Sequence, residues 1–202
     1  MLKEISNKYK VNKIVWFLTL SDIFTWGVYT IISGFIGLYI SKKIGSNVEV
    51  VLGIGIGLFY LAKGMFQIPI GIITDKIKKD KDDILFLLIG NLMMGLPYLY
   101  FPSITTPFEY YVLQFVIGTG AAMNLVNWRK IFAKNLTIGK EGLEYGFYDT
   151  IMSFSMIFLS ILAGIVSNLS DSHFDLVVLI VGIFMISSTF WVFLLYKEPR
   201  KQ

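Results

Sequence analysis

The sequence predicts an all-α integral membrane protein with six transmembrane helices. Of its 202 residues, 55% are hydrophobic and 16% are charged, and the mean hydropathy is +0.67. A soluble domain usually carries about a quarter charged residues. The apolar residues form six runs of about 18 to 27 residues, and a helix needs roughly 20 residues to cross about 30 Å of hydrocarbon. Backbone groups in lipid must be bonded within their own segment, so these runs are expected to be helical.

The six predicted spans make up a single transmembrane domain over residues 1–202. The first run is far longer than the apolar part of a signal peptide and lacks a small-residue cleavage site, so we expect it to remain as the first span. The runs cover residues 14–40, 50–73, 84–101, 109–130, 143–167 and 175–196.

Lysine and arginine lie almost entirely on one side of the predicted membrane. Nearly all of the 18 basic residues fall in the N-terminal tail, the loops after spans two and four, and the C-terminal tail. The opposite side has only Lys42 and Lys43. The positive-inside rule therefore places both termini in the cytoplasm, for a protein of the cytoplasmic (inner) membrane. This asymmetry accounts for the net charge of +4, and nucleic-acid binding need not be invoked.

The residue types that are missing exclude several kinds of site. Cysteine is absent and His173 is the only histidine. Thiolate metal sites, His-based zinc sites and Cys/His dyads are therefore excluded, and we expect no metal and no cofactor. Tyr148–Asp149 matches one half of the intramembrane aspartyl protease signature, but no Gly-x-Gly-Asp partner follows. We expect the protein not to be an enzyme.

Polar residues inside the predicted spans indicate a polar layer in the inner half of the bilayer. Asp22 and Lys63 both lie about 12 Å from the cytoplasmic edge, and Asp149 lies about 9 Å from it. Asn124 and Asn91 fall in the same slab. Ionisable groups at such depths normally face a cavity or a partner.

We expect Asp22 and Lys63 to form a charge pair. This pair would be a substrate or proton site, or alternatively a buried pair that only fixes the helix register. Three aromatic residues are further candidates for lining a pocket, although plain packing explains them as well: Trp26, Tyr29 and Tyr60. Arg129, which ends span four, would form a latch with Asp149 or contact lipid phosphates.

Glycines recur at packing intervals, most regularly in the second span. Gly57, Gly64 and Gly71 are spaced seven residues apart. Small residues on one helix face permit close approach in a bilayer, where no hydrophobic force drives association. The stripe therefore indicates either close packing or a sliding face between moving helices.

The loop after span two, GIITDKIKKDKDD (residues 71–83), has a pattern that resembles a motif of the major facilitator superfamily. That motif reads Gly-x-x-x-Asp-(Arg/Lys)-x-Gly-(Arg/Lys)-(Arg/Lys), and Gly71, Asp75 and Lys76 match it. Lys78 replaces the second glycine, and only Lys79 matches the last two basic positions. In span four, Gln114 stands where the family has an arginine, which weakens the case for arginine-mediated proton coupling.

The resemblance implies that the chain corresponds to one six-helix half of a twelve-helix transporter. Spans one, two, four and five of such a half surround the central cavity, which would place Asp22, Lys63, Asn124 and Asp149 there. Gly71, Asp75, Lys76 and Arg129 would form the gating region. Asp75 would meet a helix N-terminus or a cation of the other half, whereas residues 78–83 are interpreted as solvated charge.

The predicted function is therefore a half-size secondary transporter that moves a small solute, with or without a proton, by alternating access. Because six spans leave both termini on one side, two copies can sit parallel around a two-fold axis in the lipid bilayer. A homodimer is our first expectation. The alternatives are pairing with a separate second half, a fragment of a longer chain, and a non-transporting accessory or regulatory subunit.

Overall fold

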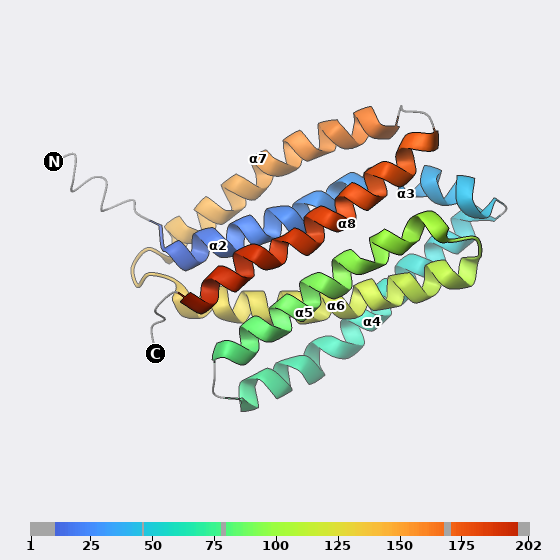
Figure 1. The fold of residues 1–202 in the computed structure, drawn as a ribbon. Helices are drawn as coiled ribbons and strands as arrows, with labels where there is room; N and C mark the ends of the chain where they lie inside the picture. Colours follow the sequence, from blue (N-terminus) through green and yellow to red (C-terminus); the bar gives the residue numbers. More distant parts are fainter. Residues whose placement is uncertain (1–10, 46, 78–79, 168–170, 198–202) are drawn as a thin grey trace.

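Six long helical segments cross the bundle in alternating directions in the computed structural model, which describes residues 11–45, 47–77, 80–167 and 171–197 (Figure 1). The first segment consists of α2 (Lys13–Asp22), the π-helical turn η1 (Ile23–Gly27) and α3 (Val28–Ile44). The others are α4 (Val48–Lys76), α5 (Asp80–Tyr100), α6 (Pro107–Asn135), α7 (Glu141–Ser167) and α8 (Asp171–Leu194), with short 3-10 turns η2 (Phe101–Ser103) and η3 (Leu195–Lys197). The all-α prediction is confirmed.

Five of the six segments are long and apolar enough to cross a membrane. The sixth, α6, has 29 residues and is as long as α4, but it carries more polar side chains. Those side chains are buried within the bundle, as Gln114, Asn124 and Asn127 illustrate. The polarity of α6 therefore reflects its position inside the protein.

Local sequence signals set several of the helix ends. Asn12 caps α2, because its side-chain oxygen accepts a hydrogen bond from the Ile14 backbone N–H at 2.9 Å. Thr106 and Glu109 form a capping box at the start of α6, with Pro107 in the first turn. The link between α6 and α7 spans only residues 136–140, so it is much shorter than the loop expected there.

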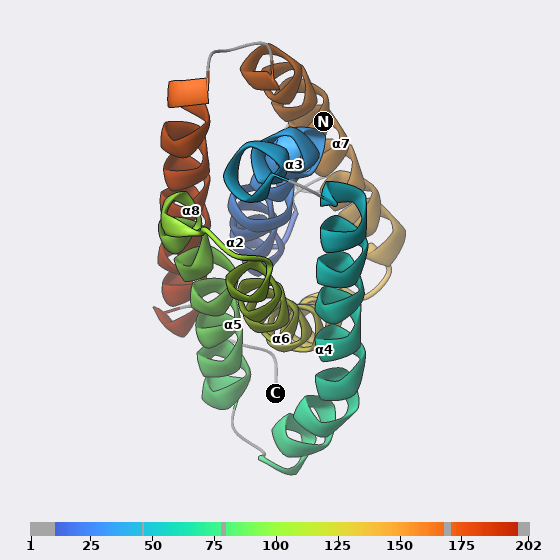
Figure 2. The same cartoon turned by 90° about the vertical axis from the view of Figure 1, so that its right-hand side faces the viewer.

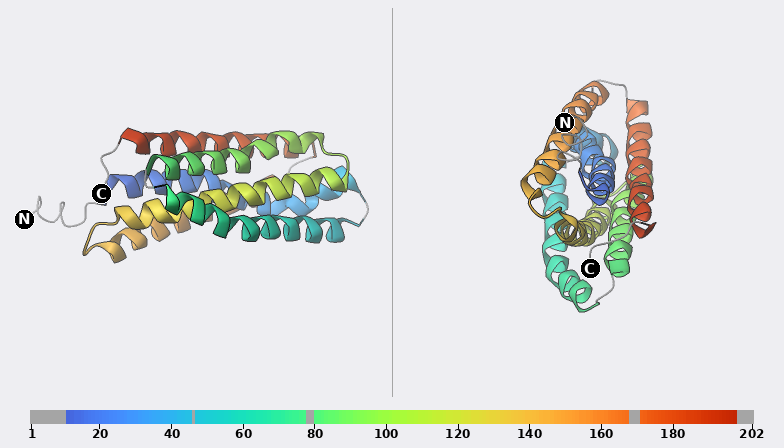
Figure 3. Two further views of the ribbon diagram at one scale, coloured as in Figure 1. Left: turned by 90° about the horizontal axis from the view of Figure 1, so that it is seen from below. Right: turned by 90° about the vertical axis from the view of Figure 1, so that its left-hand side faces the viewer.

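The helices are arranged around α6 and α5. Figure 2 shows α6 between α4 and α5, with α8 beside α5. The first segment packs against α8 and α7, and α7 lies at the periphery (Figure 3). We call the end where α2, α5 and α7 begin the basic end, because Lys81, Lys130 and Lys134 lie there. The other is the opposite end.

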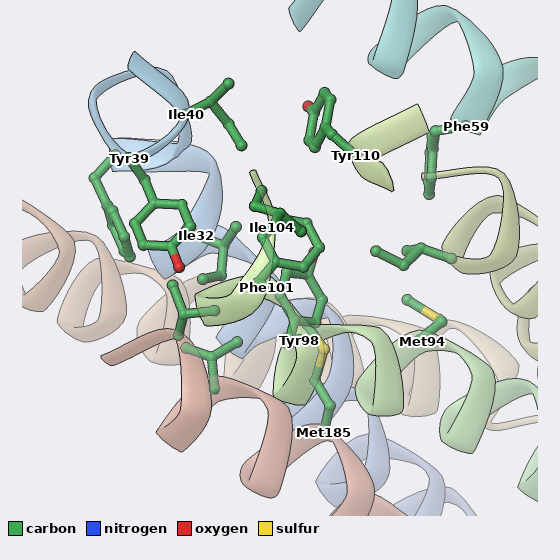
Figure 4. Packing of buried hydrophobic residues seen from close by; sticks show 14 of the residues in the cluster. Ile32, Tyr39, Ile40, Phe59, Met94, Tyr98, Phe101, Ile104, Tyr110 and Met185 are labelled. Carbon is green, nitrogen blue, oxygen red and sulfur yellow. The ribbon is translucent and has the colours of Figure 1, made fainter. Parts of the chain in front are cut away.

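Two apolar clusters fill the interior, one towards each end. The cluster at the opposite end includes stacked Tyr98 and Phe101, whose ring centroids lie 5.0 Å apart (Figure 4). The cluster at the basic end includes Trp128 stacked on Phe132 at 4.6 Å. The segments that run between the two clusters carry eight buried polar residues, which we call the polar layer: Thr19, Ser21, Asp22, Thr25, Asn91, Asn124, Asn127 and Ser188. Asp22, Asn91 and Asn124 of the predicted layer are among them, whereas Lys63 is half-buried and Asp149 is exposed.

The glycines that allow close helix packing are not those of the predicted stripe in the second span. A Cβ on Gly118 would collide with the backbone of Phe59 in α4, and one on Gly90 would collide with the backbone of α6. By contrast, a Cβ on Gly57 or Gly64 would meet nothing within 4 Å, and one on Gly71 would make only ordinary contact with Val126. The close-packing interpretation of the stripe is therefore wrong for this chain alone, because that face of α4 has no neighbour within it.

We expect Gly118→Ala to destabilise the fold, because the added methyl group must push α4 and α6 apart. Overpacking of this kind costs about 1–3 kcal/mol, which should appear as a lower thermal midpoint in detergent. Gly146→Ala, whose added methyl group would meet nothing within 4 Å, is the matched control and should leave the midpoint unchanged or slightly higher. Equal midpoints for the two variants would contradict this account of the α4–α6 contact.

Candidate functional site

A chain of buried hydrogen bonds forms the centre of the polar layer. The Asn124 amide nitrogen donates to Asn91 Oδ1 at 2.6 Å, and the Trp26 indole nitrogen donates to Asn124 Oδ1 at 2.9 Å. The Asn91 amide donates in turn to the hydroxyls of Ser188 and Ser21, at 2.8 and 3.2 Å. This network joins the first segment to α5, α6 and α8, and it fixes the orientation of Trp26.

Asp22 is buried at the end of α2, with 3% of its surface exposed. Its Oδ2 accepts a hydrogen bond from the Tyr148 hydroxyl of α7 at 2.7 Å. Its Oδ1 has no hydrogen-bond partner among the described residues. The π-helical turn η1 follows directly, and such turns are common at functional sites. Asp22 therefore has one oxygen held and one still able to take a proton or a ligand.

The predicted ion pair between Asp22 and Lys63 is not formed within the described part of the chain. Tyr148 approaches Asp22 from α7 and occupies one carboxylate oxygen. The Lys63 ammonium instead lies 5.8 Å from the centroid of the Trp26 ring and 5.6 Å from that of Tyr60. Cation–π contacts of this geometry are attractive, so the aromatic rings replace the expected carboxylate as neighbours of Lys63.

The three predicted aromatic residues lie beside Lys63 and are linked through Phe59 by a series of ring contacts. The rings of Trp26 and Tyr29 lie 6.0 Å apart, and Tyr29 stacks on Phe59 at 6.4 Å. Phe59 contacts Tyr60 at 5.1 Å, and Tyr60 is 61% exposed. The rings run from the buried network to the exposed face of α4.

Arg129 and Asp149 are both exposed, and the predicted latch between them is not formed in the described residues. The Arg129 guanidinium lies within electrostatic reach of Asp22, Lys63 and Tyr148. Asp149 lines an open depression on α7 together with Thr150, Ser153, Phe154 and Ile157. Asp149 also acts electrostatically on Tyr148.

The end of α4, where the sequence predicts a gating region, contacts a charge cluster centred on Lys130. Its ammonium lies 3.0 Å from Asp75 and 3.0 Å from Asp83, and it donates to the Thr74 carbonyl at 2.7 Å. Lys134 lies 3.7 Å from Asp83. The cation that Asp75 meets in the structure therefore belongs to α6 of the same chain.

The interpretation of residues 78–83 as solvated charge is wrong for Asp83. It is 1% exposed and pairs with two lysines, because the start of α5 packs against α6. Lys78 and Lys79 lie outside the described residues. Gly71 and Lys76 lie in the last turns of α4, and Lys76 is exposed. The sequence showed no spacing that set Asp83 apart from its acidic neighbours.

A second buried carboxylate at the basic end joins three segments. Glu144 of α7 is 0% exposed and accepts hydrogen bonds from the backbone N–H groups of Asn12 and Thr137, at 2.8 and 2.7 Å. The Thr137 hydroxyl also donates to it at 2.9 Å. Glu144 therefore ties the start of α7 to the start of α2, a role that sequence reasoning missed.

The site is suited to binding and holding charge. Among the described residues, no group of three His, Asp or Glu side chains is placed to hold a metal ion. Its groups come from the first segment, α4, α6 and α7, around an exposed face. Membrane-spanning helices with ionisable groups on such a face are typical of a transporter.

The comparison with protein families agrees with this class. The sequence model of the Major Facilitator Superfamily matches residues 15–202, and the chain belongs to this superfamily. Members of the superfamily are transporters and not enzymes. The comparison with curated proteins finds no match to the chain.

We expect Asp83→Asn to lower the free energy of unfolding, because the buried partner of Lys130 and Lys134 loses its charge. A hydrogen bond to a charged group contributes about 1.5–3 kcal/mol, so the thermal midpoint should fall clearly. Asp82→Asn, at a neighbouring position with no described ion pair, is the control and should not change it. The same midpoint for both variants would contradict the structural role of Asp83.

Proposed function

We propose that this chain is a half-size secondary transporter that moves a small solute across the cytoplasmic membrane by alternating access, as a parallel homodimer. The six helices act as one unit in this proposal, with both termini in the cytoplasm. The concentration of basic residues at the basic end supports this orientation, following the positive-inside rule.

One observation carries the proposal: four segments place polar and aromatic residues on a common face. These are the first segment with Asp22 and Trp26, α4 with Lys63, α6 with Arg129, and α7 with Tyr148. A transported solute needs polar partners inside the membrane, and ionisable residues there normally serve that purpose. Asp22 is the candidate proton acceptor, because one of its oxygens has no described partner.

The same face supports a second copy of the chain as the partner. Lys63 and Asp149 are not enclosed by the six helices, and charged groups facing lipid are costly. The exposed apolar side chains of α4 do not by themselves distinguish lipid from protein, since lipid tails are as apolar as leucine. The open glycines of α4 do favour a close neighbour, because they leave room for another helix.

The charge cluster at the basic end supports a gate. Asp75 is exposed and shares Lys130 with the buried Asp83. A salt bridge with one exposed partner is weaker than one with a buried partner, because water screens it. We propose that Asp75 exchanges between Lys130 and the other subunit as the cytoplasmic side opens, whereas Asp83 holds Lys130 in place.

We expect purified protein in proteoliposomes to take up a solute from a screen run at two pH values, and Asp22→Asn to reduce uptake at least tenfold. The substitution removes the ionisable group but keeps the shape and one acceptor for Tyr148. Uptake is measured beside expression and thermal stability, and Asp82→Asn serves as the control.

Two outcomes would contradict the proposal. Normal uptake by Asp22→Asn would remove Asp22 from the transport site. Folded dimers that move no solute under any condition would instead favour the accessory-subunit alternative.

We expect single cysteines on the open face of α4 to cross-link two copies. The chain has no native cysteine, so Gly57→Cys provides one reporter thiol per copy. Oxidation in membranes should give a dimer band, whereas Leu96→Cys, on the exposed surface of α5, should not. Cross-linking of Leu96→Cys alone would place the interface elsewhere, and no cross-linking of either variant would favour a different second half.

A further inference from the structure

We infer that the face around Lys63 and Arg129 binds a small organic anion in which a carboxylate is joined to an apolar or aromatic body. The inference rests on the proposed function, since the transported solute is the molecule that this face would meet. It adds a chemical class for that solute.

Lys63 is a cation within a membrane span that has no carboxylate partner in the described part of the chain. Its neighbours are the faces of Trp26 and Tyr60, at 5.8 and 5.6 Å. Aromatic faces attract a cation but cannot neutralise it. A lysine in this setting is costly unless an anion or water reaches it.

Arg129 gives this region a second positive charge. It is exposed, it forms no ion pair among the described residues, and its charge and that of Lys63 act on one another. Two nearby like charges disfavour each other. An anion bound on this face would reduce that repulsion. The guanidinium fork also matches the two oxygens of a carboxylate.

Two other lysines in the described structure have carboxylate partners. Lys43 at the opposite end pairs with Asp175 at 2.9 Å, and Lys130 at the basic end pairs with Asp75 and Asp83. The chain thus pairs lysines where charge serves structure. Lys63 and Arg129 depart from that pattern on the face that the proposal assigns to the solute.

The acids near this face do not take the place of such an anion. Asp22 is buried, and Tyr148 already donates to one of its oxygens. Asp149 is exposed on α7 but pairs with neither cation in the described structure. The groups open to a solute are therefore two cations and one carboxylate, an arrangement that favours an anion.

The aromatic rings indicate the rest of the molecule. Tyr29, Phe59 and Tyr60 extend from Trp26 as a series of ring contacts of 5.1 to 6.4 Å. Phe59 is buried and two of these contacts are edge-to-face, so the apolar area beside Lys63 comes from the exposed Tyr60 ring and the half-buried Trp26 ring. A carboxylate held by Lys63 and Arg129 would place its apolar body against these rings.

The test measures binding of three probes of one shape by the full-length chain in nanodiscs of neutral phosphatidylcholine. The probes are phenylacetate, its uncharged amide phenylacetamide, and the cation phenethylamine. Isothermal titration should give phenylacetate an affinity at least tenfold higher than the amide. Lys63→Gln and Arg129→Gln should each weaken phenylacetate binding at least tenfold, and Lys63→Arg should retain it. Lys81→Gln is the control, because it removes a positive charge at the basic end but outside the site.

Each other outcome overturns one specific claim. Equal binding of acid and amide, or unchanged binding by both glutamine variants, overturns the anion site. So does displacement of phenylacetate by phosphatidylglycerol that co-purifies with the protein, which would make the site one for a lipid headgroup. Uptake of a neutral or cationic solute that phenylacetate does not inhibit also overturns the site but leaves transport standing. Specific binding of phenylacetate with no uptake of any solute keeps the anion site and overturns the transport proposal.

Discussion

The amide-to-amide hydrogen bond between Asn91 and Asn124 is the contact on which the middle of this bundle depends. In a bilayer, polar groups must find partners within the protein, and these two amides satisfy one another while reaching Trp26, Ser21 and Ser188. The network lies between two apolar clusters, whose contacts alone would allow neighbouring helices to shift along their axes. The hydrogen bonds fix the axial register of the helices. The backbones of α5 and α6 come close enough for this bond because glycines replace side chains at Gly90 and Gly120.

Charge is distributed in two ways. At both ends of the bundle, ion pairs join neighbouring helices, with Lys43–Asp175 at one end and Lys130–Asp83 at the other. These pairs hold the helices in register where water limits the desolvation cost. On the open face, Lys63 and Arg129 lack such partners, and Asp22 retains one oxygen without a described contact. Ion pairs therefore join the helices at both ends of the bundle. The charged groups along one side lack such partners in the described residues, as expected of a surface that binds another molecule.

Much of the fold could be predicted from the sequence, because long apolar runs in lipid have few alternatives to helices. The polar layer was predictable in part, since Asp22, Asn91 and Asn124 lie at similar depths in their spans, whereas Lys63 and Asp149 were expected in the same layer and are not buried. The contact partners of these residues could not be predicted. Depth along a helix does not give its rotation, so the sequence favoured Lys63 for Asp22 where the structure has Tyr148. Likewise, Asp83 is one acid among several in a charged stretch, and only the packing of α5 on α6 separates it from Asp82. The sequence singled out Asp75 and predicted a cation for it, but only the tertiary contact shows that this cation is Lys130.

The π-helical turn between α2 and α3 has a consequence for how the first segment can vary. Such a turn holds one residue more than an α-helical turn. Compared with an uninterrupted α-helix of the same sequence, the residues beyond the turn are therefore rotated by about 100°, at 3.6 residues per turn. Asp22 and Tyr39 therefore lie in two separate helical phases. Loss of one residue from Ile23–Gly27 would merge these phases into one straight helix. Tyr39 would then still point towards Asp175, because the residue that is lost is the one that the wider turn had accommodated. The first segment could therefore lose one residue at this turn without reorienting the side chains on either side, whereas conversion of the turn to an α-helix at full length would rotate Tyr39 by about 100°.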